Sequence, residues 1–220
     1  MGNDYLKTLL FDKFHFLKVP ELSLPLNVVE EYNEIFYESI IHGKGGLVPY
    51  KSTYPKYMFL HYLIENKEIL VHGTNNPAID SFEPREQTLF NGKKVKAVFA
   101  STDAIWSMFF AVINRQEYNG SLRNICLTTK TKRGIRRYYY FSLNADFKGE
   151  RWTNGYIYLM PKQPFKQGGI KDEWICEDNV KPLAKIAVSP EDFIFSKDVR
   201  SHKESDPHLK TMIRYLIWGR

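Results

Sequence analysis

Residues 95–114 read VKAVFASTDAIWSMFFAVIN, so a strand pattern passes directly into a helix pattern. The first seven residues are rich in valine, alanine and phenylalanine, which favours a buried strand. The apolar residues that follow recur at three- and four-residue steps, as a helix with one buried face requires. Ser101 or Thr102 is the expected helix cap, and Asp103 in the first turn would complement the helix dipole.

Strand and helix patterns continue on both sides of this stretch. Further strands are expected at residues 68–72, 122–128, 137–143, 156–161 and 180–188. Helices are expected at residues 28–42, 54–65 and 208–218. Because helices come first and strands follow with few helices between them, the order predicts an α+β fold with a mixed or mainly antiparallel sheet. A Rossmann site is not expected, since no G-x-G-x-x-G turn follows a strand.

The pattern changes after Asn66, and this change sets the expected domain boundary. Residues 1–66 look helical and are predicted to pack on the core. Residues 67–220 contain all the expected strands and the closing basic helix. A chain of 220 residues is long enough for one large domain or for one domain with an added lobe.

The formal net charge is +6, which favours an anionic partner such as nucleic acid or a nucleotide. Part of the charge is concentrated in one segment, followed at once by three tyrosines. The basic residues of this segment are Lys130, Lys132, Arg133, Arg136 and Arg137. Such a segment can bind single-stranded nucleic acid through phosphate contacts and base stacking. The favoured interpretation is a solvated hairpin turn, with Gly134 at its tip, that leads into a tyrosine-rich strand.

Two cysteines, Cys126 and Cys176, provide neither a disulfide framework nor the spacing of a zinc site. We expect two reduced, buried thiols and no bound metal. The first 16 residues lack the continuous apolar stretch of a signal peptide. No apolar run reaches the roughly 18 residues that a membrane span needs. These features predict a cytoplasmic protein.

The chemistry-bearing motif is VHGTN at residues 71–75, where a buried strand is expected to end. A glycine at such a corner lets a ligand approach the backbone closely. The imidazole of His72 offers one donor and one acceptor, which suits a pair of ribose hydroxyls. Thr74 adds a hydroxyl of its own. The alternative is that His72 is a purely structural residue at a strand end, with its hydrogen bonds made within the protein.

Several motifs occur in a fixed order along the chain. After VHGTN come KAVFASTDAIWSMFFA at 96–111, GYIYLMPKQPF at 155–165, DEW at 172–174 and VKPLAKIAVSPEDF at 180–193. Together they resemble the diphtheria-toxin-like ADP-ribosyltransferases, and most of all the small rifampin ADP-ribosyltransferases. The resemblance covers about residues 68–195, roughly the second expected domain.

The resemblance implies that NAD is the substrate and that its nicotinamide half is bound at the first two strands. His72 would hold the ribose, with Thr74 beside it, and Gly73 would pair with the carboxamide through its backbone. Phe99 stands where the family has a tyrosine that stacks on nicotinamide, so the stacking face is kept and the hydroxyl is lost. Ser101 would lie on the pocket floor.

The resemblance also implies a carboxylate that stabilises the oxocarbenium-like ribose during transfer. Glu173 is preferred because the neighbouring Trp174 would partly desolvate it. Asp172 and Glu177 are the other candidates, and all three acids would equally fit a solvated surface. Here the sequence departs from the rifampin enzymes, since Lys, Gln and Gly at 166–168 replace an acidic stretch.

Phosphate contacts are expected from the segment between the first two strands. Arg85 is the preferred residue, because a guanidinium forms charge-assisted pairs with phosphate oxygens. Lys93 and Lys94 lie on the same segment. A solvated loop without a ligand is the alternative for all three residues.

Three functions follow from these observations. The first is NAD-dependent transfer of ADP-ribose, with release of nicotinamide, to an unidentified protein, nucleic-acid or small-molecule acceptor; a toxin role is compatible with it. The second is a non-catalytic module that binds a nucleotide or nucleic acid on the same fold. The third is an RNA 2′-phosphotransferase, which is disfavoured because the strand region after His72 lacks a further histidine before His202.

Overall fold

The computed structural model describes residues 2–43, 45–89 and 91–219. The chain forms two compact units. Unit 1 consists of Met1–Ser23, Arg115–Arg151 and Ile194–Arg220, and unit 2 of Leu24–Asn114 and Trp152–Phe193. Neither unit has a boundary at residue 66, because the N-terminal residues up to Ser23 group with segments from the middle and end of the chain.

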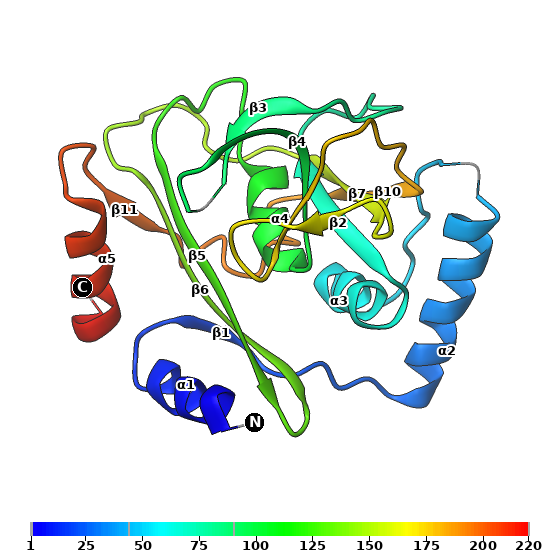
Figure 1. The fold of residues 1–220 in the computed structure, drawn as a ribbon, viewed down its shortest axis with the longest axis horizontal. Helices are drawn as coiled ribbons and strands as arrows, with labels where there is room; N and C mark the ends of the chain where they lie inside the picture. Colours follow the sequence, from blue (N-terminus) through cyan, green and yellow to red (C-terminus); the bar gives the residue numbers. More distant parts are fainter. Residues whose placement is uncertain (1, 44, 90, 220) are drawn as a thin grey trace. The chain divides into compact units, whose positions relative to one another are not determined.

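Unit 2 contains a sheet whose neighbouring strands are antiparallel (Figure 1). Its order is β10 (Ala184–Val188), β7 (Gly155–Pro161), β2 (Ile69–Thr74), β4 (Lys94–Ser101), β9 (Glu173–Cys176) and β8 (Lys166–Gln167), with β3 (Arg85–Thr88) paired to β4. The expected strand at 180–188 is shorter than predicted. It begins at Ala184, and Val180 instead forms an isolated bridge with Phe82.

Helix α4 (Ala104–Val112) follows β4 directly, as the opening stretch of sequence predicts. The predicted cap was wrong, because Asp103 caps this helix. Asp103 accepts a hydrogen bond from the Trp106 backbone N–H at 2.8 Å, three residues along, in the geometry of an N-cap. Ser101 supports the turn by accepting from the Asp103 N–H at 2.9 Å.

Two glycines let α4 pack directly on the sheet. A Cβ atom at Gly73 of β2 would lie 1.9 Å from the Ser107 carbonyl oxygen. A Cβ at Gly155 of β7 would lie 1.8 Å from the Ala111 carbonyl oxygen. The helix backbone therefore lies against the strand backbones, which brings the end of β2 under the middle of α4.

The remaining helices of unit 2 precede the sheet in the chain. They are α2 (Leu26–Ile35), the π-helix η1 (Phe36–Ile41) and α3 (Lys56–Asn66). The helix expected at 28–42 is thus an α-helix that widens into a π-helix. Its buried positions, Val28, Tyr32, Phe36 and Ile40, recur every four residues across both parts.

Unit 1 is built around a long hairpin of β5 (Leu122–Thr131) and β6 (Gly134–Asn144) (Figure 1). The other edge of β6 pairs with β1 (Leu17–Val19) antiparallel and with β11 (Arg200–His202) parallel. Strand β1 corrects the expectation that the first 66 residues are helical; three residues are too few to show an alternating pattern.

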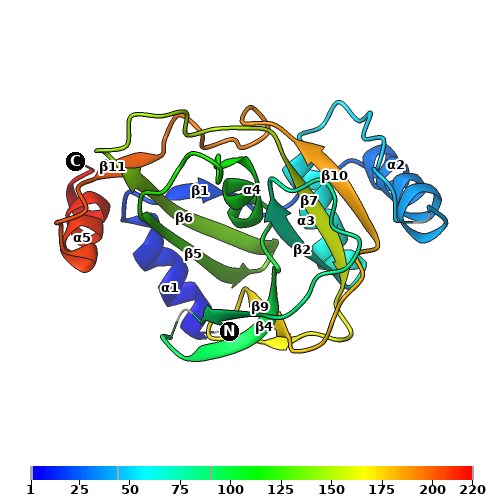
Figure 2. The ribbon, with the colours of Figure 1, turned by 90° about the horizontal axis from the view of Figure 1, so that it is seen from above.

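Two helices complete unit 1, α1 (Gly2–Asp12) and α5 (His208–Trp218). Figure 2 shows α1 alongside the hairpin. Tyr138 and Tyr140 of β6 are buried in a cluster with Phe16, Tyr215 and Leu216. Each sheet thus has its own helices, and the fold belongs to the α+β class, as predicted.

Both cysteines are buried thiols that form no disulfide, in agreement with the sequence analysis. Cys126 lies on β5 of unit 1 and Cys176 on β9 of unit 2. Across the described parts of the chain, every helix is too short or too polar to cross a membrane.

The packing of α4 on β2 leads to a stability prediction. Gly73→Ala should lower the free energy of unfolding by about 3 kcal/mol or more, since the new Cβ meets backbone atoms that cannot rotate away. Gly46→Ala is the matched control, with no atom within 4 Å of its Cβ, and should change stability by less than about 0.5 kcal/mol. Urea denaturation of both variants measures the difference; equal stabilities would contradict the packing.

Candidate functional site

A cavity of about 220 Å³ lies in unit 2 at the point where β2 and β4 separate. The two strands pair at Val71 and Ser101. Beyond this pair, the imidazole Nδ1 of His72 forms a 2.7 Å hydrogen bond with the Phe99 carbonyl. The side chain thus takes the place that the backbone of a neighbouring strand would occupy. The cavity is lined by His72, Thr74, Asn76, Ile79, Ser81, Phe82, Glu83, Arg85, Gln87, Ala97, Val98 and Phe99.

The hydrogen bond to Phe99 decides the tautomer of His72. A carbonyl oxygen only accepts, so Nδ1 carries the hydrogen, and Nε2 of the neutral ring is left as an acceptor. Burial lowers the pKa of His72; the Phe99 carbonyl opposes this effect, and the nearby charge of Arg85 adds to it. His72 is therefore neutral near pH 7 and presents an acceptor suited to a hydroxyl donor.

The side of the cavity formed by the segment after β2 is held firmly. The Phe82 ring lies edge-on to His72, with 4.7 Å between ring centroids, and to Tyr158 at 5.1 Å. Two backbone hydrogen bonds to Val180, of 2.8 and 2.9 Å, fix Phe82. The Tyr158 hydroxyl accepts from the Ile79 N–H at 3.1 Å and donates to the Asn76 carbonyl at 3.0 Å.

One guanidinium and one carboxylate line the cavity. Arg85 begins β3, and its side chain is exposed, so it can meet a ligand from solvent. Lys93 and Lys94, the other phosphate candidates, are exposed but do not line the cavity. Glu83 is exposed as well and lies two residues before Arg85.

The structure thus brings together four of the residues predicted from the sequence. They are His72, Thr74, Arg85 and Phe99. Sequence reasoning missed Glu83, Gln87 and Phe82, because the segment between β2 and β4 shows no apolar periodicity that would orient its side chains. The spacing of Glu83 and Arg85 at i and i+2 was the one signal, since alternate residues of an extended segment share a face.

Gly73 and Ser101 do not line the cavity. Gly73 faces α4, as its contact with the Ser107 carbonyl shows. Ser101 is buried and donates to the Asp172 carbonyl at 2.8 Å, which ties the end of β4 to the segment before β9. Both residues hold the framework of the site, and the ligand contacts that the resemblance implies for them stay predictions.

The preferred acid, Glu173, also lies outside the cavity lining. Its side chain is buried, and Oε1 accepts a hydrogen bond from the Gly169 N–H at 2.6 Å. A Cβ at Gly168 would lie 2.7 Å from the same oxygen, so the loop wraps tightly around the carboxylate. Glu173 therefore anchors the turn between β8 and β9.

The two other acids have different partners. Asp172 is buried and accepts from the Thr102 hydroxyl at 2.8 Å. Glu177 is exposed and pairs with the Lys166 ammonium at 2.6 Å, which lowers the pKa of Glu177. Neither lines the cavity.

The basic segment of unit 1 forms the expected hairpin. Thr131 pairs with Gly134, leaving Lys132 and Arg133 as a two-residue turn. Residues 138–140, the three tyrosines, are buried and have no face available for a nucleic-acid base. Of the basic residues, Lys130, Lys132 and Arg133 are exposed. Binding of nucleic acid through this segment stays a prediction for phosphate contacts alone.

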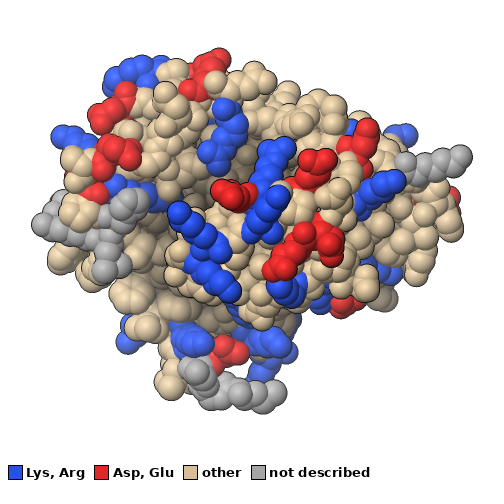
Figure 3. Space-filling view, turned by 45° about the horizontal axis from the view of Figure 1, so that its top comes forward, with Lys and Arg blue, Asp and Glu red and all other residues tan. Residues whose placement is uncertain are grey.

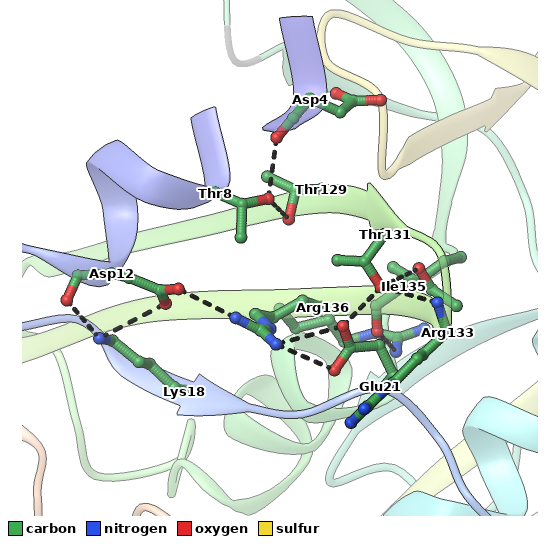
Figure 4. Close-up of polar contacts among 12 residues, drawn as sticks. Asp4, Thr8, Asp12, Lys18, Glu21, Thr129, Thr131, Arg133, Ile135 and Arg136 are labelled. Carbon is green, nitrogen blue, oxygen red and sulfur yellow. Dashed lines mark hydrogen bonds and ion pairs between the residues drawn. The ribbon is translucent and has the colours of Figure 1, made fainter. Parts of the chain in front are cut away.

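The two remaining arginines of the segment, Arg136 and Arg137, are engaged by other residues of unit 1 or buried within it. Arg137 is buried. Arg136 pairs with Asp12 at 2.9 Å and with Glu21 at 3.3 Å (Figure 4). Partial burial would raise the pKa of Glu21, but the Thr131 hydroxyl and Arg136 together hold it below its ordinary value. Arg136 therefore joins α1 and the segment after β1 to the hairpin.

Figure 3 shows one face on which Lys and Arg side chains occur in separate groups with Asp and Glu side chains among them. No group of three or more metal-ligating side chains is found in the described ranges.

Comparison with protein-family models, with curated proteins and with solved structures found no match to this chain.

The pKa of His72 supplies a test of the site's electrostatics. We expect the imidazole to titrate below about 6.5 in an NMR titration, and Arg85→Ala to raise that midpoint. Lys96→Ala removes an exposed charge from the paired strand outside the cavity lining and should leave the midpoint unchanged. Because the folded-state pKa is the lower one, the stability that His72 contributes is complete above about pH 7 and is lost as the pH falls through the folded-state pKa. A midpoint above that of free histidine would contradict this electrostatic description.

Proposed function

We propose that unit 2 binds NAD with its nicotinamide ribose at the His72 cavity, and that the protein transfers ADP-ribose to an acceptor. The observation that carries the proposal is the convergence of His72, Arg85 and Phe99 on one cavity. These residues come from three strands, and the motif resemblance assigns each of them to the same ligand. The acceptor is a protein, a nucleic acid or a small molecule.

The size of the cavity supports partial enclosure of the dinucleotide. Its 220 Å³ is below the roughly 300–1,000 Å³ of sites that enclose a drug-sized ligand. It suits one ring and its sugar. The pyrophosphate would then lie toward the exposed Arg85, where a guanidinium can pair with two phosphate oxygens at once.

Each contact has a chemical role in this arrangement. Nε2 of neutral His72 accepts from a ribose hydroxyl, which holds the sugar in place. Phe99 presents an aromatic face for the nicotinamide ring. Thr74 adds a hydroxyl that either donates or accepts. Arg85 supplies the positive charge that the pyrophosphate requires.

We propose Glu83 as the carboxylate of the reaction. Cleavage of the bond between nicotinamide and the ribose passes through an oxocarbenium-like state with positive charge on the sugar. A carboxylate beside the ribose stabilises that charge and can accept the proton of the acceptor nucleophile. Glu83 lines the cavity, whereas Glu173 is hydrogen-bonded to Gly169 outside the lining.

A nucleotide-binding module without turnover is the second candidate. It is favoured by the exposure of Glu83, because a solvated carboxylate stabilises developing charge less than a desolvated one. Phe99 also lacks the hydroxyl of the tyrosine that stands at its position in the resembling family. An RNA 2′-phosphotransferase receives less support, since one histidine and one arginine line the cavity.

NAD binding can be tested with one arginine variant, one histidine variant and one lysine control. Calorimetric titration of NAD should show binding that Arg85→Ala weakens by about 1.5–3 kcal/mol, through loss of a charged hydrogen bond. His72→Ala should weaken it by about 1–3 kcal/mol. Lys96→Ala, which removes one charge from the neighbouring strand, should bind as the parent chain does. No heat of binding from the parent chain would refute the site.

The catalytic prediction separates the two candidate functions. Nicotinamide release from NAD should be slowed at least about tenfold by Glu83→Gln while NAD affinity stays unchanged. Glu86→Gln is the matched control, since this exposed acid of β3 lies outside the lining and opposite Lys96. Binding without any nicotinamide release, with acceptor candidates present, would establish the module and exclude the transferase.

A further inference from the structure

We infer that a second pocket of unit 2 binds a small organic carboxylate with an apolar body. This pocket has a volume of about 500 Å³, within the roughly 300–1,000 Å³ of small-molecule sites. No residue lines both this pocket and the His72 cavity. The inference therefore does not rest on the proposed NAD chemistry.

The walls of the pocket are mainly apolar. Phe36 and Ile41 come from the π-helix η1, Phe165 from the turn after β7, and Trp174 from β9. π-helical turns are rare and often occur at functional sites. Aromatic and aliphatic walls of this kind bury an apolar body, so they select for a ligand that carries one.

The polar groups of the pocket are mostly donors. Lys67 lies with its ammonium 4.9 Å from the Phe36 ring centroid, and no carboxylate of the described residues pairs with it. The indole N–H of Trp174 is buried and has no hydrogen-bond partner in the described part of the chain. A buried donor without a partner is costly, and a ligand that accepts from it removes that cost.

A third donor, Lys162, forms an ion pair with Glu68, the one acid among the residues that line the pocket. Its ammonium lies 3.0 Å from the carboxylate of Glu68 and 5.3 Å from the centroid of the Trp174 ring. The Glu68 side chain is 81% exposed, so this ion pair lies at the edge of the pocket. Glu68 also has a left-handed backbone, with φ of 50°, which a non-glycine residue rarely adopts.

These groups specify the charge of the ligand. The residues that line the pocket carry two ammonium groups and one indole N–H against a single, exposed carboxylate, so the lining has an excess of donors and of positive charge. A carboxylate satisfies both, because it brings a negative charge and several acceptor lone pairs. The apolar walls then accommodate the remainder of the molecule.

The test compares carboxylates with neutral molecules of the same shape. Benzoate, phenylbutyrate and octanoate are titrated calorimetrically into the full chain, each beside its corresponding alcohol. We expect at least one carboxylate to bind at least about tenfold more tightly than its alcohol. Equal affinities, or no binding by any of the three carboxylates, would overturn the inference.

Substitutions then locate the binding. Trp174→Phe keeps an aromatic ring and removes the N–H, and Lys67→Met keeps the apolar stem and removes the charge. Each should weaken carboxylate binding by about tenfold, with little effect on the alcohols. If neither variant changes the carboxylate affinity, the ligand binds elsewhere.

The sharpest variant is one that should increase affinity. Glu68→Gln releases Lys162 from a competing carboxylate, and we expect binding about two- to fivefold tighter, given the usual strength of an exposed ion pair. Glu177→Gln is its matched control, since it breaks another exposed Lys–Glu pair, to Lys166, outside this pocket. Weaker binding by Glu68→Gln, or an equal gain in Glu177→Gln, would contradict the assignment.

Discussion

The close contact between α4 and the strands β2 and β7 determines how unit 2 is arranged. Gly73 and Gly155 lie under carbonyl groups of the helix, and any side chain at either position would push the helix away from the sheet. Asp103 caps the start of α4, so the helix begins at a defined point above β2. The position of His72, next to Gly73, follows from this contact, because its side chain projects from the opposite face of the strand.

The separation of β2 from β4 then creates the candidate site. Where two strands part, backbone carbonyls lose their partners, and each must find another because a buried unpaired carbonyl is costly. Phe99 finds its partner in His72. That one bond satisfies the strand edge, fixes the imidazole tautomer and leaves Nε2 as an acceptor on a residue that lines the cavity.

Unit 1 shows why a cluster of basic residues does not by itself indicate a binding surface. The sequence brings five basic residues and three tyrosines together, yet β-strand alternation and burial separate their roles. Arg136 is paired with acids from two other segments, and the tyrosines form the core. The exposed Lys132 and Arg133 remain at the turn, where a hairpin needs polar residues in any case.

Apolar periodicity and turn residues are local signals, so the α+β class, the β4–α4 junction and the hairpin could all be predicted from the sequence. Strands of two to four residues, such as β9, carry too few positions to show such a pattern. The positions of Glu83 in the cavity lining and of Glu173 outside it, in contrast, follow from the folded structure alone. The direction of an acidic side chain depends on the strand and loop that pack beside it, and those neighbours are distant in sequence.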